Sequence, residues 1–264
     1  MGLSALRACV PPLPWEELRP HHSFSPPDLR TALSVPALTP LPQHRNPRNP
    51  RAIAVAPGDM WTLAGTKGSG KTFAEKQLAR ELLRLFPDMG VNVLDPKPDE
   101  GFDTWPGLVG SDEAPEPAAP GQVVVWRPGY DNLTEYDRWF ESILKGKRRA
   151  LVVIDELSSV CDKQGRTVQN LQRLMKQNRS LGITLEIGTQ ETHWIPRQTL
   201  GLAVHILRFA LLHPRDANAI DHDYLGLTDR REPIQKHGFL YCNVSANPRH
   251  VFEYSSIREL LRSA

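Results

Sequence analysis

A glycine-rich segment in the first third of the chain has the residue types and the spacing of a phosphate-binding loop. It matches the pattern GxxxxGK[ST] at every position and consists of Gly65, Thr66, Lys67, Gly68, Ser69, Gly70, Lys71 and Thr72. Such glycines let the backbone curl until its N–H groups converge on a phosphate, and a helix that begins here adds a favourable dipole. We expect Lys71 to bridge the β- and γ-phosphates of ATP and the Thr72 hydroxyl to bind Mg²⁺. A glycine-rich turn without a ligand is the alternative, but the apolar strand before the loop and the amphipathic helix after it favour the phosphate site.

Two acidic residues close an apolar run in the middle of the chain. Asp155 and Glu156 follow the strand-like residues 151–154 (LVVI). A carboxylate at the C-terminal end of such a strand lies beside the phosphate loop, so we expect Asp155 to hold Mg²⁺ through water. Glu156 is then the candidate general base for the attacking water, and a helix-capping surface acid is the alternative. The polar pair Thr189 and Gln190 follows the next predicted strand, where Gln190 is expected to contact the γ-phosphate or to orient the water.

Strands and helices alternate along the chain after its first 50 residues. The pattern of apolar residues predicts strands at 60–64, 91–95, 123–126, 150–155, 183–188, 204–212, 238–242 and 250–254. It predicts helices at 73–86, 134–144, 167–180 and 216–225, and an acidic, proline-rich surface loop at 111–121. This order is typical of an α/β fold with a mainly parallel sheet and helices on both faces.

The first 50 residues differ from the rest of the chain because they contain eleven of its 24 prolines. Proline lacks a backbone N–H and fixes φ, so we expect residues 1–50 to form an extended arm and residues 51–264 to form one P-loop ATPase domain. No apolar run approaches the roughly 18 residues of a membrane span, and the N-terminus lacks the pattern of a signal peptide. The three scattered cysteines argue against a disulfide framework or a zinc site and favour a reducing, cytoplasmic compartment.

The charge of the chain gives only a weak indication of its partners. A net charge of +2 is too small to indicate a nucleic acid by itself. One stretch nevertheless carries five basic residues and no acidic one, namely Lys163, Arg166, Arg173, Lys176 and Arg179. These side chains would either contact the phosphates of a nucleic acid or form an ordinary solvated face.

Several short segments outside the phosphate loop resemble the signatures of one group of ATPases. Residues 178–183 (NRSLGI) with 188–190 (GTQ) resemble the GR(A/S)xGI…(A/G)TQ stretch of the FtsK/HerA superfamily of DNA-translocating ATPases, and residues 93–97 (VLDPK) resemble its DPK signature. The segments WRP and GFLY also resemble parts of that superfamily, so the resemblance covers roughly residues 55 to 255. It implies a RecA-like (ASCE) core in a homo-oligomeric ring, usually a hexamer, with ATP at the subunit interfaces. It also implies an arginine finger supplied in trans, for which Arg215 is the first candidate and Arg179 the second, while a plain surface or ion-pair role is the alternative for each.

From the sequence we expect no membrane segment, no N-terminal β-barrel and no C-terminal winged-helix module, in contrast to larger members of this superfamily. A compact motor of this kind most resembles the genome-packaging ATPases of tailless icosahedral viruses with internal membranes. The resemblance implies a packaging motor that hydrolyses ATP with Mg²⁺ and pumps double-stranded DNA in the host cytoplasm, with capsid or vertex proteins as further partners. The alternatives are a DNA-transfer or translocase ATPase of a plasmid or integrative element, and a P-loop switch or kinase that does not move DNA.

Overall fold

The computed structural model describes residues 53–96, 102–128, 132–190, 197–211, 220–227, 236–246 and 249–262. Its strands are β1 (Met60–Ala64), β2 (Gly90–Leu94), β3 (Leu108–Gly110), β4 (Val123–Arg127), β5 (Ala150–Ile154), β6 (Ile183–Thr189), β7 (His205–Arg208), β8 (Phe239–Asn243) and β9 (Val251–Tyr254). Its helices are α1 (Lys71–Leu85), α2 (Leu133–Gly146), α3 (Gln169–Leu181), α4 (Arg197–Leu202) and α6 (Ile257–Arg262), with a 3₁₀ turn η3 (Leu157–Val160) and a π-helical turn η5 (Asp221–Leu225). The arm predicted for residues 1–50 lies outside the described residues.

The described strands form one sheet in the order β3-β4-β2-β5-β6-β1-β7-β8-β9. The strands from β3 to β7 in this order run parallel, whereas β8 and β9 are antiparallel to their neighbours. β6 lies between β1 and β5, so that Leu185 is aligned with both Met60 and Val152. The strand that leads into the glycine-rich loop is therefore separated by one strand from the strand that leads into Asp155. The predicted α/β fold with a mainly parallel sheet is confirmed.

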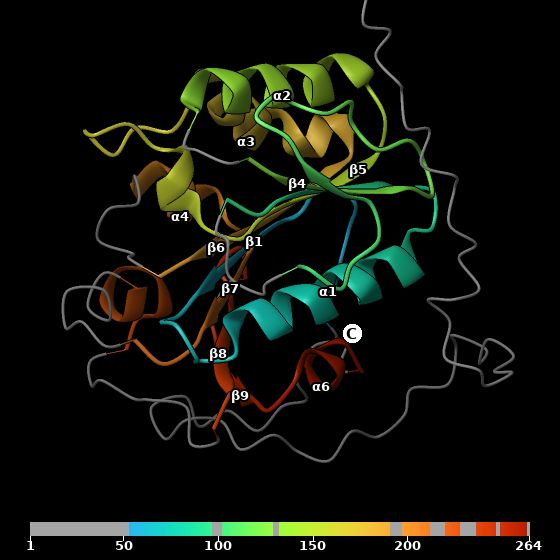
Figure 1. The fold of residues 1–264 in the computed structure, drawn as a ribbon. Helices are drawn as coiled ribbons and strands as arrows, with labels where there is room; N and C mark the ends of the chain where they lie inside the picture. Colours follow the sequence, from blue (N-terminus) through green and yellow to red (C-terminus); the bar gives the residue numbers. More distant parts are fainter. Residues whose placement is uncertain are drawn as a thin grey trace, which may run out of the picture.

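Helices cover both faces of this sheet (Figure 1). α1 and α6 lie on one face, where Trp61 and Leu63 of β1 belong to the core. α2 and α3 lie on the other face, where Met60 and Ala64 of the same strand belong to a second core. Because both faces are covered, a central strand such as β5 is buried at every residue, which explains its continuous apolar sequence.

The structure corrects several predictions about individual elements. β7 is shorter than the strand predicted at 204–212. The described part of the helix predicted at 216–225 is helical, from Ile220 through the π-helical turn η5. The sequence pattern does not predict β3, α4 or α6. Each of these elements has six residues or fewer, and such short segments show no clear period.

The acidic loop at 111–121 lies partly at the surface, as predicted, but it is anchored to the sheet. The indole N–H of Trp126 donates to the carbonyl of Ser111 (2.7 Å), and the N–H of Ala118 donates to the side chain of Asn92 (2.8 Å). These two hydrogen bonds join the loop to β4 and β2, respectively. Within the parts of the chain that the structure describes, no helix has the length and apolar character that crossing a membrane requires.

Candidate nucleotide-binding site

Three parallel strands end at the same edge of the sheet and bring the predicted site residues together. β1 leads into the glycine-rich loop, β5 leads into Asp155, and β6 ends at Thr189. Backbone hydrogen bonds hold the loop at this edge, since the N–H of Gly65 donates to the carbonyl of Thr189 (3.0 Å) and the N–H of Thr66 donates to that of Ala210 (3.0 Å). The loop is thus fixed between the ends of β6 and β7.

The glycines of the loop are required by its backbone and by its close neighbours. Gly68 and Gly70 have φ values of +78° and +95°, a region that favours glycine. A Cβ on Gly65 would lie 2.6 Å from the Cβ of Phe209, and a Cβ on Gly70 would lie 2.9 Å from the Cβ of His237. His237 comes from the segment before β8 and itself has a φ of +64°. His237 was not predicted to line the loop, because nothing in the sequence links it to a segment so far away in the chain.

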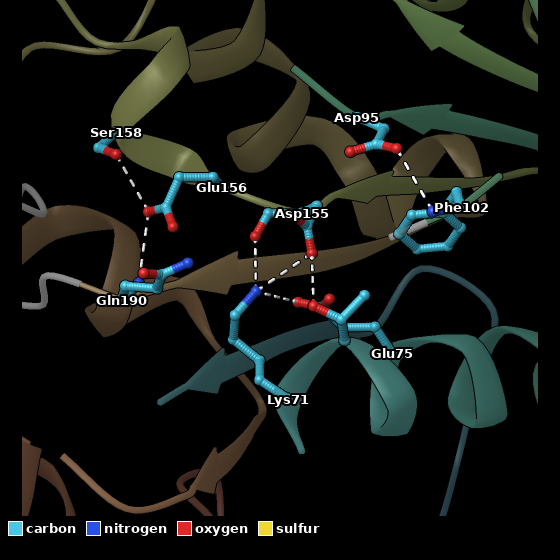
Figure 2. Close-up of polar contacts among 9 residues, drawn as sticks. Lys71, Glu75, Asp95, Phe102, Asp155, Glu156, Ser158 and Gln190 are labelled. Atoms are coloured by element: carbon cyan, nitrogen blue, oxygen red, sulfur yellow. Dashed lines mark hydrogen bonds and ion pairs between the residues drawn. The ribbon is translucent and has the colours of Figure 1, made fainter. Parts of the chain in front are cut away.

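Lys71, at the start of α1, points toward the end of β5 (Figure 2). Its ammonium group donates to the Asp155 carbonyl oxygen (2.7 Å), to Asp155 Oδ1 (3.2 Å) and to Glu75 Oε1 (3.0 Å). The Thr72 hydroxyl donates to the same Asp155 Oδ1 (3.1 Å). Burial opposes the ionisation of Asp155, but the positive charge of Lys71 and these hydrogen bonds outweigh it and lower the pKa of Asp155 to about 2. Asp155 is therefore a carboxylate at neutral pH.

This set of residues fits a nucleotide with its magnesium ion. Mg²⁺ prefers oxygen ligands and is commonly held by one or two carboxylates together with substrate phosphates. Thr72 and Asp155 place a hydroxyl and a carboxylate side by side, and Lys71 supplies a cation for the phosphates. The hydroxyl of Ser69 is buried within the loop and has no hydrogen-bond partner among the described residues. Thr72 and Asp155 are thus the residues that would hold the metal.

Glu156 lies beside these groups and is held by its neighbours. Its Oε1 accepts a hydrogen bond from the Ser158 hydroxyl (3.0 Å) and from the backbone N–H of Gln190 (3.3 Å), as Figure 2 shows. The side chain is only 2% exposed, which contradicts the alternative of a helix-capping surface acid. The structure thus brings Gln190 to Glu156 through its backbone N–H. Ser158 was not predicted as a site residue, although its position two residues after Glu156 was a signal.

Two further buried glutamates lie beneath Lys71, and the sequence analysis missed both. Glu75 in α1 and Glu186 in β6 are fully buried. Burial raises the pKa of each well above the usual value of a glutamate, and the nearby Lys71 ammonium only partly opposes this. Neither carboxyl oxygen of Glu186 has a hydrogen-bond partner among the described residues. The signals were the spacing of four residues between Lys71 and Glu75, and an acid within the otherwise apolar strand around Glu186.

The segments VLDPK and WRP contact each other next to this edge. Arg127 forms ion pairs with Asp95 and Asp103, and it lies at the end of β4, which pairs with β2. Asp95 also accepts a hydrogen bond from the backbone N–H of Phe102 (3.4 Å). These contacts hold the ends of β2 and β4 together beside β5, which gives both segments a positioning role in the fold.

Of the two candidate arginine fingers, Arg179 belongs to the described residues and Arg215 does not. Arg179 is 64% exposed near the end of α3, and its guanidinium lies 3.8 Å from Asp59 at the start of β1. It therefore lies at the edge of the sheet opposite the glycine-rich loop, about 20 Å away if the seven residues of β6 rise ~3.3 Å each. Such a distance prevents Arg179 from reaching a nucleotide in its own subunit. Arg215 lies outside the described residues.

Comparisons with known proteins agree with this geometry at the level of the fold. No family model matches the sequence, and no curated protein matches it. Among solved structures, the DNA-packaging ATPase B204 from Sulfolobus turreted icosahedral virus matches with a TM-score of 0.60 at 17% identity, over 75% of this chain and 98% of that one. The genome-packaging NTPase B204 of Sulfolobus turreted icosahedral virus 2, in complex with ATP-gammaS, matches with a TM-score of 0.59 at 19% identity over the same shares.

A solved structure of a different kind also shares the architecture. VirB4 of Thermoanaerobacter pseudethanolicus matches with a TM-score of 0.50 at 13% identity, over 76% of this chain and 90% of that chain. At identities this low, the structural similarity shows the fold alone, and the activity has to be argued from the site. The protein therefore has the P-loop α/β fold that the viral packaging NTPase B204 also has.

Proposed function

We propose that this protein is an ATP-hydrolysing motor that moves double-stranded DNA as a homo-oligomeric ring, in the manner of a viral genome-packaging ATPase. The observation that carries the proposal is the position of Glu156, a buried acid held by the Gln190 N–H beside Lys71, Thr72 and Asp155. A general base for water is needed for hydrolysis. A kinase that passes its phosphate to a bound acceptor, or a switch that only binds nucleotide, has no need of a base for water at this position.

Each residue of the site has a definite part in this reaction. The loop N–H groups and Lys71 bind the phosphates, and Glu156 accepts the proton of the attacking water while the backbone of Gln190 keeps its carboxylate in place. Mg²⁺, held by Thr72 and Asp155, would neutralise negative charge on the phosphates. An arginine from a neighbouring subunit would complete the charge stabilisation, and the position of Arg179 opposite its own loop supports an action in trans.

Support for DNA as the partner comes from the outer face of α3 and the turn before it. All five basic residues between Lys163 and Arg179 are exposed. Arg166 forms an ion pair with Asp162 (Nε to Oδ2, 2.8 Å), and Arg179 lies near Asp59. Part of this positive charge is therefore already compensated within the chain. The remaining positive charge gives a face to which DNA phosphates can bind.

The proposal is tested by measuring ATP hydrolysis with and without double-stranded DNA. We expect turnover that depends on Mg²⁺ and rises when duplex DNA is added, together with displacement of a third strand from a DNA triplex as a direct sign of translocation. ATP binding without DNA-stimulated turnover would instead support the switch. Genes for capsid proteins next to this gene would separate a packaging motor from a DNA-transfer ATPase of a plasmid or integrative element.

The DNA-binding face is tested by replacing Lys163 and Arg166 with alanine. Each phosphate contact contributes about −0.9 to the slope of log affinity against log salt concentration, so the double variant should bind all duplexes more weakly and with a flatter slope. The matched control replaces Arg84 and Arg258, which are equally exposed but lie on α1 and α6 at the opposite face of the sheet. Equal losses in both double variants would contradict a DNA face on α3.

A further inference from the structure

All three N–H groups of Lys71 face acceptors of the protein itself (Figure 2). A lysine ammonium has three donors, and here they face the Asp155 carbonyl oxygen (2.7 Å), Asp155 Oδ1 (3.2 Å) and Glu75 Oε1 (3.0 Å). A phosphate oxygen needs at least one of these donors. Binding of the β- and γ-phosphates by Lys71 therefore has to break at least one contact that the structure shows.

Of the two partners of Lys71, Glu75 has no part in the proposed reaction. Asp155 is the expected ligand of Mg²⁺, whereas Glu75 lies one helical turn after Lys71 in α1 and is completely buried. A buried carboxyl group is costly unless it is paired. The hydrogen bond that Glu75 accepts from Lys71, together with its hydrogen bond to Asp155, compensates for part of this cost. A movement of Lys71 away from Glu75 is therefore opposed.

A glycine in another element makes room for this contact. A Cβ on Gly188 of β6 would lie 2.0 Å from Glu75 Oε1, 2.7 Å from Lys71 Nζ and 2.4 Å from the Asp155 carbonyl oxygen. Any other residue at this position would occupy the space in which Lys71 meets Glu75. The contact is therefore built by three elements, α1, β5 and β6, and is not a chance pairing of two neighbouring side chains on one helix.

We propose that Glu75 is a positioning residue that holds Lys71 against β5, so that the β- and γ-phosphates of a nucleotide must compete with Glu75 for the lysine. The inference rests on the proposed binding of ATP by the glycine-rich loop. Loss of the Glu75 acceptor destabilises the arrangement seen here without removing any contact to the phosphates. Nucleotides that reach Lys71 should then bind more tightly, and a nucleotide that ends at the α-phosphate should not.

The experiment compares the dissociation constants of ATP, ADP and AMP by titration calorimetry. In Glu75→Met, which has a similar length but lacks a carboxyl oxygen, we expect ATP and ADP to bind on the order of tenfold more tightly, the effect of one hydrogen bond to a charged group. AMP should bind as it does to the wild type. If Glu75→Met fails to fold, Glu75→Asp takes its place in the experiment, because aspartate keeps an acid but is too short to reach Lys71. ATP and ADP should then bind more tightly to Glu75→Asp than to the wild type. Glu75→Gln, which keeps an oxygen acceptor, should remain close to the wild type.

Two controls separate this role from a general structural one. Glu186→Gln removes the acid of the other buried glutamate on this face and should leave all three affinities unchanged. In a chain that also carries Lys71→Ala, replacing Glu75 should have no further effect on ATP or ADP. Unchanged or weaker ATP binding in Glu75→Met and Glu75→Asp, or an equal shift for AMP, would overturn the inference while leaving the ATPase proposal standing. A wild-type protein that binds none of the nucleotides would overturn both.

Discussion

Replacement of Glu156 by glutamine should separate nucleotide binding from hydrolysis. Two hydrogen bonds hold the Oε1 of Glu156, which accepts from the Ser158 hydroxyl and the Gln190 N–H. A glutamine offers a carbonyl oxygen in the same place, so both hydrogen bonds and the shape of the site persist. An amide cannot accept the proton of water, however, and turnover should fall by about 10²–10⁴-fold, the usual contribution of a positioned base. This loss corresponds to about 3–5 kcal/mol in the activation barrier.

The assay pairs steady-state ATP hydrolysis with calorimetric titration of ATP in the presence of Mg²⁺. The expected result is an unchanged dissociation constant together with the loss of turnover. Ser158→Ala serves as the matched control, because it removes one hydrogen bond from Glu156 but leaves the carboxylate, and it should lower turnover by only about tenfold. If Glu156→Gln loses binding and turnover together, Glu156 is a structural residue. If it retains full turnover, the base has been assigned to the wrong residue.

Three other predictions follow from the same site. Lys71→Ala should abolish hydrolysis and weaken nucleotide binding, because it removes the expected side-chain cation from the phosphates; full turnover in the purified variant would refute the assignment. Arg215→Ala subunits, inactive alone, should regain activity when mixed with Lys71→Ala subunits, whereas rescue of Arg179→Ala subunits instead would identify the other arginine as the finger. Glu186→Gln should unfold at higher denaturant concentration than the wild type at pH 8 but not at pH 4. Because burial raises the pKa of Glu186 in the folded protein, the unfolded wild type loses its proton first as the pH rises, and the stability of the folded wild type falls by up to about 1.4 kcal/mol per pH unit between the two pKa values; a stability difference that does not change with pH would contradict this reasoning.

The central elements of the fold were predictable because their sequences are continuous apolar runs or have one apolar face, and because their ends are clearly marked. The strand at Met60–Ala64 has the predicted bounds, and α1 begins at Lys71, two residues before the predicted start. The order of the strands in the sheet was a different matter. The apolar runs of β1, β5 and β6 look alike, and nothing in them specifies that β6 lies between the other two.

Within the candidate site, the residues that belong to a sequence motif were predictable, and the residues that support them were not. Lys71, Thr72 and Asp155 come together as expected, because each occupies a fixed position in a motif with a known geometry. Glu75 and His237 have no such position. The contact of Glu75 with Lys71 follows from a spacing of four residues on α1, whereas the contact of His237 with the loop depends on the segment before β8, which is placed only when the sheet is assembled.

The place of β1 in the sheet has a consequence for how the protein is made on the ribosome. β1 and the glycine-rich loop emerge early, but both neighbours of β1 emerge late, β6 beginning at Ile183 and β7 at His205. Pairing between such distant segments is slow and leaves apolar strand edges exposed until it is complete. During synthesis β1 therefore remains unpaired until β6 and β7 have emerged, and the glycine-rich loop cannot be held between the ends of these two strands before that point. The edge of the sheet that carries the glycine-rich loop is thus among the last parts of the fold to be completed.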